Sequence, residues 1–205
     1  MTNPPSSSAL DEETARAELY GVIAELFYAP SRAELLAQLR VAATEAPAAG
    51  GFLEEPWRQL VGVAREMDDA AIQKEYDALF GGVGKPEVYA FASHFISGFL
   101  NEKPLATLRR DMAVRGITRA QNVYEPEDNI ASLLEMMGGL VVGRFGAPAT
   151  LSDQREFFNK HISPWAAHFF SDLEAAKNSV LYASVGAVGK AFMAIEAESF
   201  RMSAE

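Results

Sequence analysis

The sequence predicts an all-α protein, a single bundle of about ten helices whose N- and C-terminal halves are joined by a hinge. Apolar residues recur at intervals of three and four positions along nearly the whole chain, as on the buried face of a helix. No segment shows the alternation of apolar and polar residues that marks a half-buried strand. Proline and glycine fall between the periodic segments, where helices end. The helices are too apolar to stand apart, so we expect them to pack around one core.

Four helices are expected in the N-terminal part of the chain. Residues 1–10 are rich in Pro and Ser and are expected to form a disordered tail, which leaves residues 11–205 as one helical domain. The first helix ends before Pro30, because proline cannot continue a helix. Pro56 suits the first position of the third helix. The expected helix starts are near Asp11, after Ser31, at Glu55 and after Asp68 or Asp69.

The middle of the chain contains a glycine-rich break and a candidate hinge. Residues 81–86 combine glycines with a lysine and a proline, so they are expected to form a loop. An aromatic-rich helix is expected from about Val88 to Leu100, and another from Pro104 to about Gly116. Residues 116–124 show weak periodicity and are the expected hinge.

The C-terminal part begins with an acidic motif, residues 124–129, placed ahead of a strongly apolar helical run. Pro126 suits the first helical position, and acidic side chains around it interact favourably with the helix dipole. A turn is expected over residues 143–150, followed by a helix over residues 152–161. Ser163 and Pro164 are the expected N-cap and first position of the next helix, and the last helix contains Leu181.

The charge balance argues against nucleic acid as a partner. The chain has 18 Lys and Arg against 28 Asp and Glu, a formal net charge of -10. Such a field repels a phosphate backbone, whereas it attracts a basic peptide. An N-terminal DNA-binding head is also excluded, because the first 60 residues hold four basic and nine acidic side chains.

The absence of cysteine excludes disulfides, thiol catalysis and cysteine-ligated metal sites. The N-terminus lacks the basic start and apolar run of a secretory signal, and no apolar run is long enough to cross a bilayer. We therefore expect a cytoplasmic protein without stable membrane insertion.

Few residues have the spacing of a catalytic or metal site. Gly81 to Lys85 resembles a phosphate loop only in composition, because Leu79 and Pro86 stand where such a loop needs Gly and Ser or Thr. His161 and His168 would lie two turns apart on one helix, too far to ligate one metal ion. We expect no metal and no cofactor, although a small-molecule or guanine-nucleotide-dependent enzyme stays open as an alternative. Acid–base catalysis would need acids buried close together, and the concentrated set is Glu125, Glu127, Asp128 and Glu135.

Three segments match a set of known motifs in order and spacing. The first, Glu75 to Gly82 leading to Pro86 and Tyr89, is similar to a Tyr-x-x-Leu-Phe segment with glycines and a proline. The second, residues 125–129, is similar to Glu-Pro-x-Asp-His, with Asn in place of His. The third, Phe157 to Tyr182, is similar to a C-terminal His-Leu, Trp, Phe pattern. Together they resemble the TorD/DmsD/NarJ family of cytoplasmic redox-enzyme maturation chaperones.

The resemblance implies a binding function, so the chain is not expected to be an enzyme. Such chaperones recognise the twin-arginine signal peptide and the apo catalytic subunit of a molybdenum-cofactor oxidoreductase, and they delay its export until the cofactor is inserted. Residues 81–104 look most like members that serve formate dehydrogenases. Some members are linked to guanine nucleotides and to domain-swapped dimers, so the resemblance leaves both a monomer and a swapped dimer open.

The resemblance also implies which residues bind the peptide. Carboxylates hold guanidinium groups in charge-assisted, often bidentate hydrogen bonds, and an apolar groove can hold the hydrophobic part of the peptide. Asn129 belongs to this peptide-binding motif but, unlike the family's His, cannot become cationic. The other candidates are Glu125, Glu127 and Asp128 as arginine partners, Pro126 as the rigid turn, and Tyr76, Phe80, Pro86 and Tyr89 as groove-lining residues.

Overall fold

The computed structural model describes residues 7–28, 33–44, 51–81, 85–119 and 125–203. These residues form ten α-helices and one short π-helical segment, η1, which confirms the predicted all-α class. The elements are α1 (Ser7–Tyr28), α2 (Ala33–Val41), α3 (Gly51–Glu66), α4 (Asp69–Phe80), α5 (Ala92–Ser97), α6 (Lys103–Val114), α7 (Ile130–Val142), α8 (Leu151–Phe157), η1 (Phe158–Ile162), α9 (Ala166–Ala175) and α10 (Leu181–Met202).

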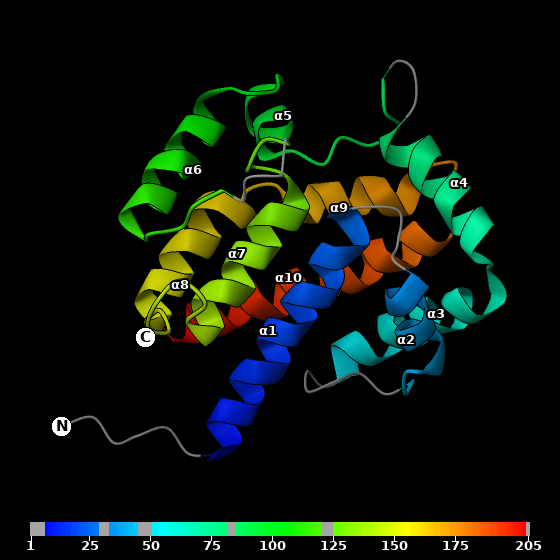
Figure 1. Ribbon diagram of the computed structural model, residues 1–205, viewed down its shortest axis with the longest axis horizontal. Coiled ribbons are helices and arrows are strands. Elements are labelled where there is room, and N and C mark those ends of the chain that lie inside the picture. The colour runs from blue at the N-terminus through cyan, green and yellow to red at the C-terminus, as the bar shows by residue number, and fades with distance from the viewer. Residues whose placement is uncertain (1–6, 29–32, 45–50, 82–84, 120–124, 204–205) are drawn as a thin grey trace.

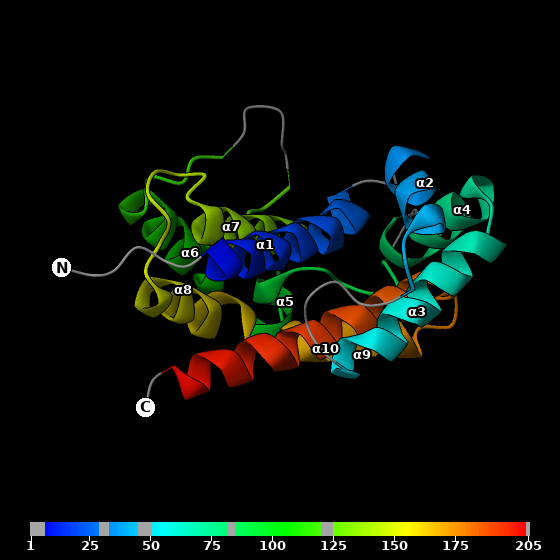
Figure 2. The same cartoon turned by 90° about the horizontal axis from the view of Figure 1, so that it is seen from below.

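The helices lie in two layers. Helices α1 and α7 are side by side in one layer, and the long α10 runs in the other with α9 alongside it (Figure 1, Figure 2). Helices α2, α3 and α4 gather at one end of the molecule, and α6 and α8 lie at the other (Figure 1). Helix α7 is buried along almost its whole length, so the acidic motif at its start is held in a fixed position by the core.

Helix α1 packs closely on α7 at a glycine. A Cβ atom at Gly138 would lie 3.1 Å from the Cβ of Tyr20 and 3.2 Å from the carbonyl oxygen of Ala17, so a larger residue would push the two helices apart. Helix α7 ends at Gly143, whose φ of 73° is left-handed and suits glycine. The predicted turn after this helix is confirmed, because α8 begins only at Leu151.

An aromatic cluster joins the end of α1 to α4, α9 and α10. The ring centroid of Phe27 lies 5.8 Å from that of Phe80, 5.4 Å from that of Phe169 and 5.9 Å from that of Tyr182. Tyr76 packs against Phe80 with 5.1 Å between ring centroids. Edge-on and tilted pairs at these distances are favourable. Two of the predicted groove residues, Tyr76 and Phe80, thus contribute to core packing.

The predicted helix from Val88 to Leu100 is wrong in length, because α5 covers only its middle. The chain before α5 is extended and pairs with the start of α7. The N–H of Ile130 donates to the carbonyl of Ala90 (2.8 Å), and the N–H of Ala92 donates to the carbonyl of Asp128 (2.9 Å). These tertiary backbone bonds override the helical spacing of the aromatic residues.

The predicted helix starts at Pro56 and at Ser163–Pro164 are also wrong. Helix α3 begins more than a turn before Pro56, because the fully buried Leu53 extends its apolar face upstream. Before α9 the α-helix changes to the π-helix η1, in which the N–H of Ser163 donates to the carbonyl of Phe158, five residues earlier (2.9 Å). Ser163 and Pro164 therefore close η1, and α9 starts beyond them.

Several predicted connecting segments fall partly outside the described residues. These are residues 1–6 of the tail, 82–84 of the glycine-rich loop and 120–124 of the hinge. Helix α1 already begins at Ser7, inside the expected tail, and residues 117–119 follow α6 without helical structure. Within the described part of the chain, no helix is both long and apolar enough to cross a membrane.

Candidate functional site

The acidic motif forms a turn that leads into α7. The N–H of Asn129 donates to the carbonyl of Pro126 (3.2 Å), which closes the turn ahead of the helix. The Oδ1 of Asn129 accepts from the N–H of Ala131 (2.9 Å) and caps α7. The predicted placement of Pro126 at the first helical position is therefore wrong, because Asn129 supplies the capping oxygen and the helix starts at Ile130.

Glu127 is buried and paired with arginines of its own chain. Its Oε2 accepts from Nε and Nη2 of Arg109 at 3.0 and 2.8 Å, and Nη1 of Arg119 lies 3.9 Å from its Oε1. Burial alone would raise the pKa of Glu127, but the hydrogen bonds and charge of Arg109, helped by the charge of Arg119, lower it below the ordinary 4.5. Glu127 is thus ionised and already occupied by guanidinium groups.

Asp128 is 1% exposed and lines a different cavity from Glu127. Its Oδ2 accepts from the N–H of Ser93 (2.8 Å) at the start of α5. Its Oδ1 is buried and has no hydrogen-bond partner among the described residues. The structure therefore separates Asp128 from the other two predicted arginine partners.

Glu125 is the exposed acid of the turn. Its Oε2 accepts from Nδ2 of Asn129 (3.1 Å), and its backbone carbonyl accepts from Nη2 of Arg119 (3.0 Å). Partial burial of the carboxylate raises the pKa of Glu125. Within the part of the chain that the structure describes, this carboxylate forms no ion pair. It is the acid of the motif that can accept a new cationic partner without losing an existing one.

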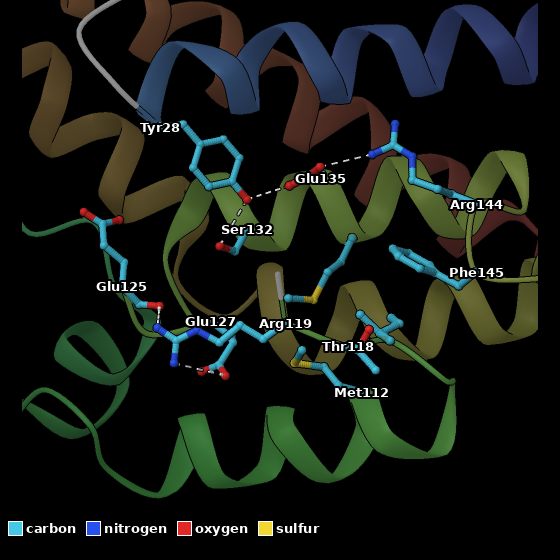
Figure 3. A pocket seen from close by; sticks show the side chains of 12 residues that line it. Tyr28, Met112, Thr118, Arg119, Glu125, Glu127, Ser132, Glu135, Arg144 and Phe145 are labelled. Carbon is cyan, nitrogen blue, oxygen red and sulfur yellow. Dashed lines mark hydrogen bonds and ion pairs between the residues drawn. The ribbon is translucent and has the colours of Figure 1, made fainter. Parts of the chain in front are cut away.

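Glu125 and Glu127 lie beside a cavity of about 140 Å³ between α1, α6 and α7 (Figure 3). Its lining carries three carboxylates and two guanidinium groups, from Glu125, Glu127, Glu135, Arg119 and Arg144. On the far side from Glu127, the hydroxyl of Tyr28 donates to Glu135 (2.6 Å), which also accepts from Arg144 (3.1 Å). Burial, and then the hydrogen bond to Glu135, raise the pKa of Tyr28, so its hydroxyl stays protonated.

The four predicted groove residues lie in two segments, Tyr76 and Phe80 on α4 and Pro86 and Tyr89 in the chain before α5. Burial raises the pKa of Tyr76 to about 12, and the negative charges of Glu125 and Asp77 add to this effect, which places Tyr76 within electrostatic reach of the turn. Phe80 belongs to the aromatic cluster of the core. Pro86 and Tyr89 are half-buried in the extended chain before α5. Tyr89 stacks there on His94 with 4.1 Å between ring centroids.

Sequence reasoning missed the arginine on α6 that pairs with Glu127, and the two arginines and the tyrosine that line the cavity. Arg109 and Arg119 precede the turn on α6 and the segment after it, and Arg144 follows α7. Tyr28 comes from the end of α1, about a hundred residues earlier in the chain. No local spacing links these residues to the acidic motif, because the contacts depend on how α1, α6 and α7 pack.

The described residues contain no group of three or more His, Cys, Asp or Glu side chains that could hold a metal ion. Residues 82–84 of the glycine-rich loop lie outside the described residues, so the structure adds nothing to the sequence argument on phosphate binding. What the site can do chemically is accept hydrogen bonds from a cation at Glu125, beside a partly apolar cavity that Tyr28 also lines.

Acid is expected to weaken the attachment of the turn to α6. A carboxylate whose pKa is lower in the folded than in the unfolded state adds stability above the unfolded pKa, and this is lost as the pH falls through the folded pKa. The free energy of unfolding should therefore drop as the pH is lowered from about 4.5 through the depressed pKa of Glu127. Urea unfolding at a series of pH values should show that the free energy of unfolding falls less steeply with pH in Arg109→Met, which removes the main partner of Glu127. Identical pH profiles for the two proteins would contradict this role of Arg109.

Comparison with known proteins agrees with the motifs. The sequence profile of the family described as nitrate reductase delta subunit matches residues 47–171, more than half of the chain. The chaperone protein TorD of Vibrio atlanticus is 24% identical over 142 residues, which cover 65% of this chain and 66% of that relative, just under two thirds. The chaperone protein TorD of Vibrio cholerae serotype O1 is 23% identical over 194 residues, which cover 87% of this chain and 88% of that protein. This chain belongs to the nitrate reductase delta subunit family.

Proposed function

We propose that this protein is a cytoplasmic chaperone for the maturation of a molybdenum-cofactor oxidoreductase. It binds the twin-arginine signal peptide and the apo catalytic subunit of its client and delays export until the cofactor is inserted. Membership of the family and the chaperone names of the Vibrio relatives support this type of function. The likeness of residues 81–104 to members that serve formate dehydrogenases favours a client of that kind.

The observation that carries the proposal is the state of the Glu125 carboxylate. It is exposed, it has a neutral amide as its hydrogen-bond partner, and it stands beside a cavity with a surplus of one carboxylate over its guanidinium groups. A guanidinium group of the peptide can replace the amide of Asn129 and form a charge-assisted, bidentate pair, which is stronger than the bond it replaces.

The neighbouring groups suit an arginine better than a lysine. Tyr28 lines the same cavity as Glu125, and the negative charge of Glu125 contributes to the raised pKa of Tyr76. A planar guanidinium can stack on an aromatic ring while it holds the carboxylate with two N–H groups, which a lysine ammonium cannot do. Glu127 contributes by holding Arg119, which in turn fixes the backbone at Glu125.

Replacing Glu125 by glutamine should weaken the binding of a twin-arginine peptide about tenfold or more, because a hydrogen bond to a charged group contributes about 1.5–3 kcal/mol. Isothermal titration calorimetry gives the dissociation constants. Glu54→Gln, an exposed substitution of the same chemistry on α3, is the matched control and should bind like the unchanged protein. Equal affinities for both variants, with the fold intact by circular dichroism, would rule out Glu125 as the arginine partner.

A further inference from the structure

Three large apolar side chains are exposed where α5 leads into α6. Ile96 is 47%, Phe99 71% and Leu100 42% exposed, and we call these three residues the α5 patch. All eight residues from position 96 to position 103 are exposed, so this connection projects from the protein surface. Single exposed apolar residues are common on soluble proteins, but a contiguous group of large ones indicates a surface that binds a partner.

The backbone on both sides of Phe99 and Leu100 is fixed in a turn. The N–H of Gly98 donates to the carbonyl of His94 (2.9 Å), which ends α5. Gly98 and Asn101 adopt left-handed φ values of 78° and 60°, a conformation that glycine and asparagine tolerate better than most residues. The turn therefore holds the side chains of Phe99 and Leu100 outside the core, in contact with water.

The segment around the α5 patch is basic, although the protein as a whole is acidic. Residues 96–119 hold five basic and two acidic side chains, whereas the rest of the chain holds 13 basic and 26 acidic ones. Three of the five basic side chains form ion pairs with glutamates. The other two, Lys103 and Arg110, are exposed and have no ion pair within the described part of the chain. Their charges are therefore free to attract an anionic partner.

Lys103 and Arg110 lie on one face of α6. Residues three, four and seven positions apart share a face of a helix, and this face also carries Ala106, Ala113 and Val114, all of them exposed. Val114 is 83% exposed. The outer face of α6 thus combines two cations with small and apolar side chains, and the α5 patch adjoins its first turn.

We infer that the α5 patch and this face of α6 bind the surface of an anionic lipid bilayer. The α5 patch enters the headgroup region, where its apolar side chains leave water, and Lys103 and Arg110 contact lipid phosphates. The protein then lies on the membrane without crossing it. This inference rests on the exposed surface alone and is independent of the proposed function.

The shape of the connection favours a bilayer over a folded protein as the partner. A projecting tip of eight exposed residues can be surrounded by lipid headgroups, whereas a folded protein would need a matching hollow to cover it. An acidic protein would also complement the charges of Lys103 and Arg110, so it is the competing partner in the test below.

The acidic remainder of the protein sets the orientation on the membrane. Helices α2, α3 and α4 lie at the end of the molecule opposite α6 (Figure 1). Electrostatic repulsion is screened over about 8 Å at physiological ionic strength, so acids at that distant end hardly oppose contact at α6. Glu102, exposed beside Lys103, does oppose it. We therefore expect binding to be weak, reversible and sensitive to salt.

Cosedimentation with vesicles tests the apolar part of the surface. The unchanged protein should bind vesicles of phosphatidylcholine and phosphatidylglycerol in equal parts. Phe99→Ser should weaken this binding about tenfold, because a phenylalanine ring no longer leaves water. Phe52→Ser is the matched control, since Phe52 is 87% exposed on α3 at the other end of the molecule, and it should bind like the unchanged protein.

A pair of double variants tests the charged part of the surface. Lys103→Gln with Arg110→Gln should weaken binding to the same vesicles about tenfold or more, because each cation near an anionic surface adds to the attraction. Arg58→Gln with Lys74→Gln removes two exposed cations from α3 and α4 and changes the net charge equally. This control should weaken binding far less, since these positions face away from the membrane in the proposed orientation.

Fluorescence gives an independent readout of insertion. Both native tryptophans are buried, Trp57 at 7% and Trp165 at 1% exposed, so bromine atoms on lipid acyl chains should not quench them. In Phe99→Trp, brominated lipids in the anionic vesicles should quench the added tryptophan. In Phe52→Trp they should leave the fluorescence unchanged.

Four results would overturn the inference. One is the absence of binding to the anionic vesicles at low salt. Another is binding that Phe99→Ser leaves as strong as Phe52→Ser does, or that both double variants weaken equally. A third is a dimer in sedimentation velocity that Phe99→Ser dissociates, because a second copy of the chain would then cover the α5 patch. The fourth is a photo-cross-link in cells from p-benzoylphenylalanine at position 99 to an acidic protein and not to lipid.

Discussion

Replacing Glu75 by alanine is expected to lower the free energy of unfolding by about 3–4 kcal/mol, because it leaves buried N–H groups without acceptors. Glu75 is 6% exposed, and its carboxylate accepts from the N–H groups of Val180 (2.8 Å), Leu181 (3.1 Å) and Tyr182 (2.7 Å). These are the first amides of α10, which have no acceptor within their own helix. Glu75 thus links α4 to the start of α10. It accepts hydrogen bonds from the first N–H groups of α10, whose own N-cap residue makes no side-chain hydrogen bond.

Urea unfolding followed by circular dichroism measures the loss. Glu75→Gln keeps one acceptor oxygen but turns an amide toward a backbone N–H, so an intermediate loss of about 1–2 kcal/mol is expected. Asp77→Ala, an exposed change on the same helix, should stay within about 0.5 kcal/mol of the unchanged protein. If Glu75→Ala were as stable as Asp77→Ala, Glu75 would not be the cap of α10.

Replacing Glu196 by alanine is expected to lower the free energy of unfolding by about 3–5 kcal/mol. The buried guanidinium of Arg16 loses its main charged partner and keeps only Glu13, at 3.1 Å, while the buried hydroxyl of Tyr20 loses its acceptor. Glu196 accepts from Nε and Nη2 of Arg16 at 2.8 and 2.6 Å, and from the hydroxyl of Tyr20 at 2.6 Å. The side chains of Arg16 and Glu196 are only 16% and 3% exposed. Burial acts to lower the pKa of Arg16, but Glu196 outweighs it and raises that pKa, which keeps the guanidinium charged.

The double variant Arg16→Met with Glu196→Leu separates the cost of leaving the buried Arg16 charge without Glu196 from the cost of lost packing contacts. With both charges removed, most of the stability should return, because buried ion pairs are often replaceable by apolar residues of similar volume. Glu198→Ala, exposed on the same helix, is the control and should change stability by less than about 0.5 kcal/mol. A double variant as unstable as Glu196→Ala would show that the loss does not come from the buried charge of Arg16.

Local patterns in the sequence predicted much of this fold. The spacing of Leu133, Leu134 and Met137 predicted α7, and all three side chains are fully buried. Asp68 or Asp69 was predicted to cap α4, and it is the side chain of Asp68 that accepts from the N–H of Ala71 at 2.7 Å. Both features depend on neighbours within a few residues, and such neighbours can be found from one sequence.

What the sequence could not predict depends on contacts between distant segments. The aromatic residues from Val88 onward have helical spacing, but backbone bonds from Ala90 to Ile130 hold this segment extended. Glu125, Glu127 and Asp128 look equivalent in sequence, yet tertiary packing gives Glu127 two arginines, buries Asp128 and leaves Glu125 exposed. This difference is why we propose Glu125, among the three candidates, as the arginine partner.

Asn129 has a definite role where the family's motif has His. It caps α7 with its Oδ1 and holds Glu125 with its Nδ2, and both bonds come from a neutral amide. A histidine at this position could become cationic and pair with Glu125, whereas Asn129 leaves the full negative charge of Glu125 for an external partner.

We propose that the exposed turn at the start of α7 recognises arginine. A calorimetric titration of the unchanged protein with a twin-arginine peptide, and with the same peptide carrying two lysines, tests this recognition. The arginine peptide should bind about tenfold more tightly or better, because only a guanidinium can hold the Glu125 carboxylate with two parallel N–H groups. Equal affinity for the two peptides, or no binding of the arginine peptide, would contradict the claim.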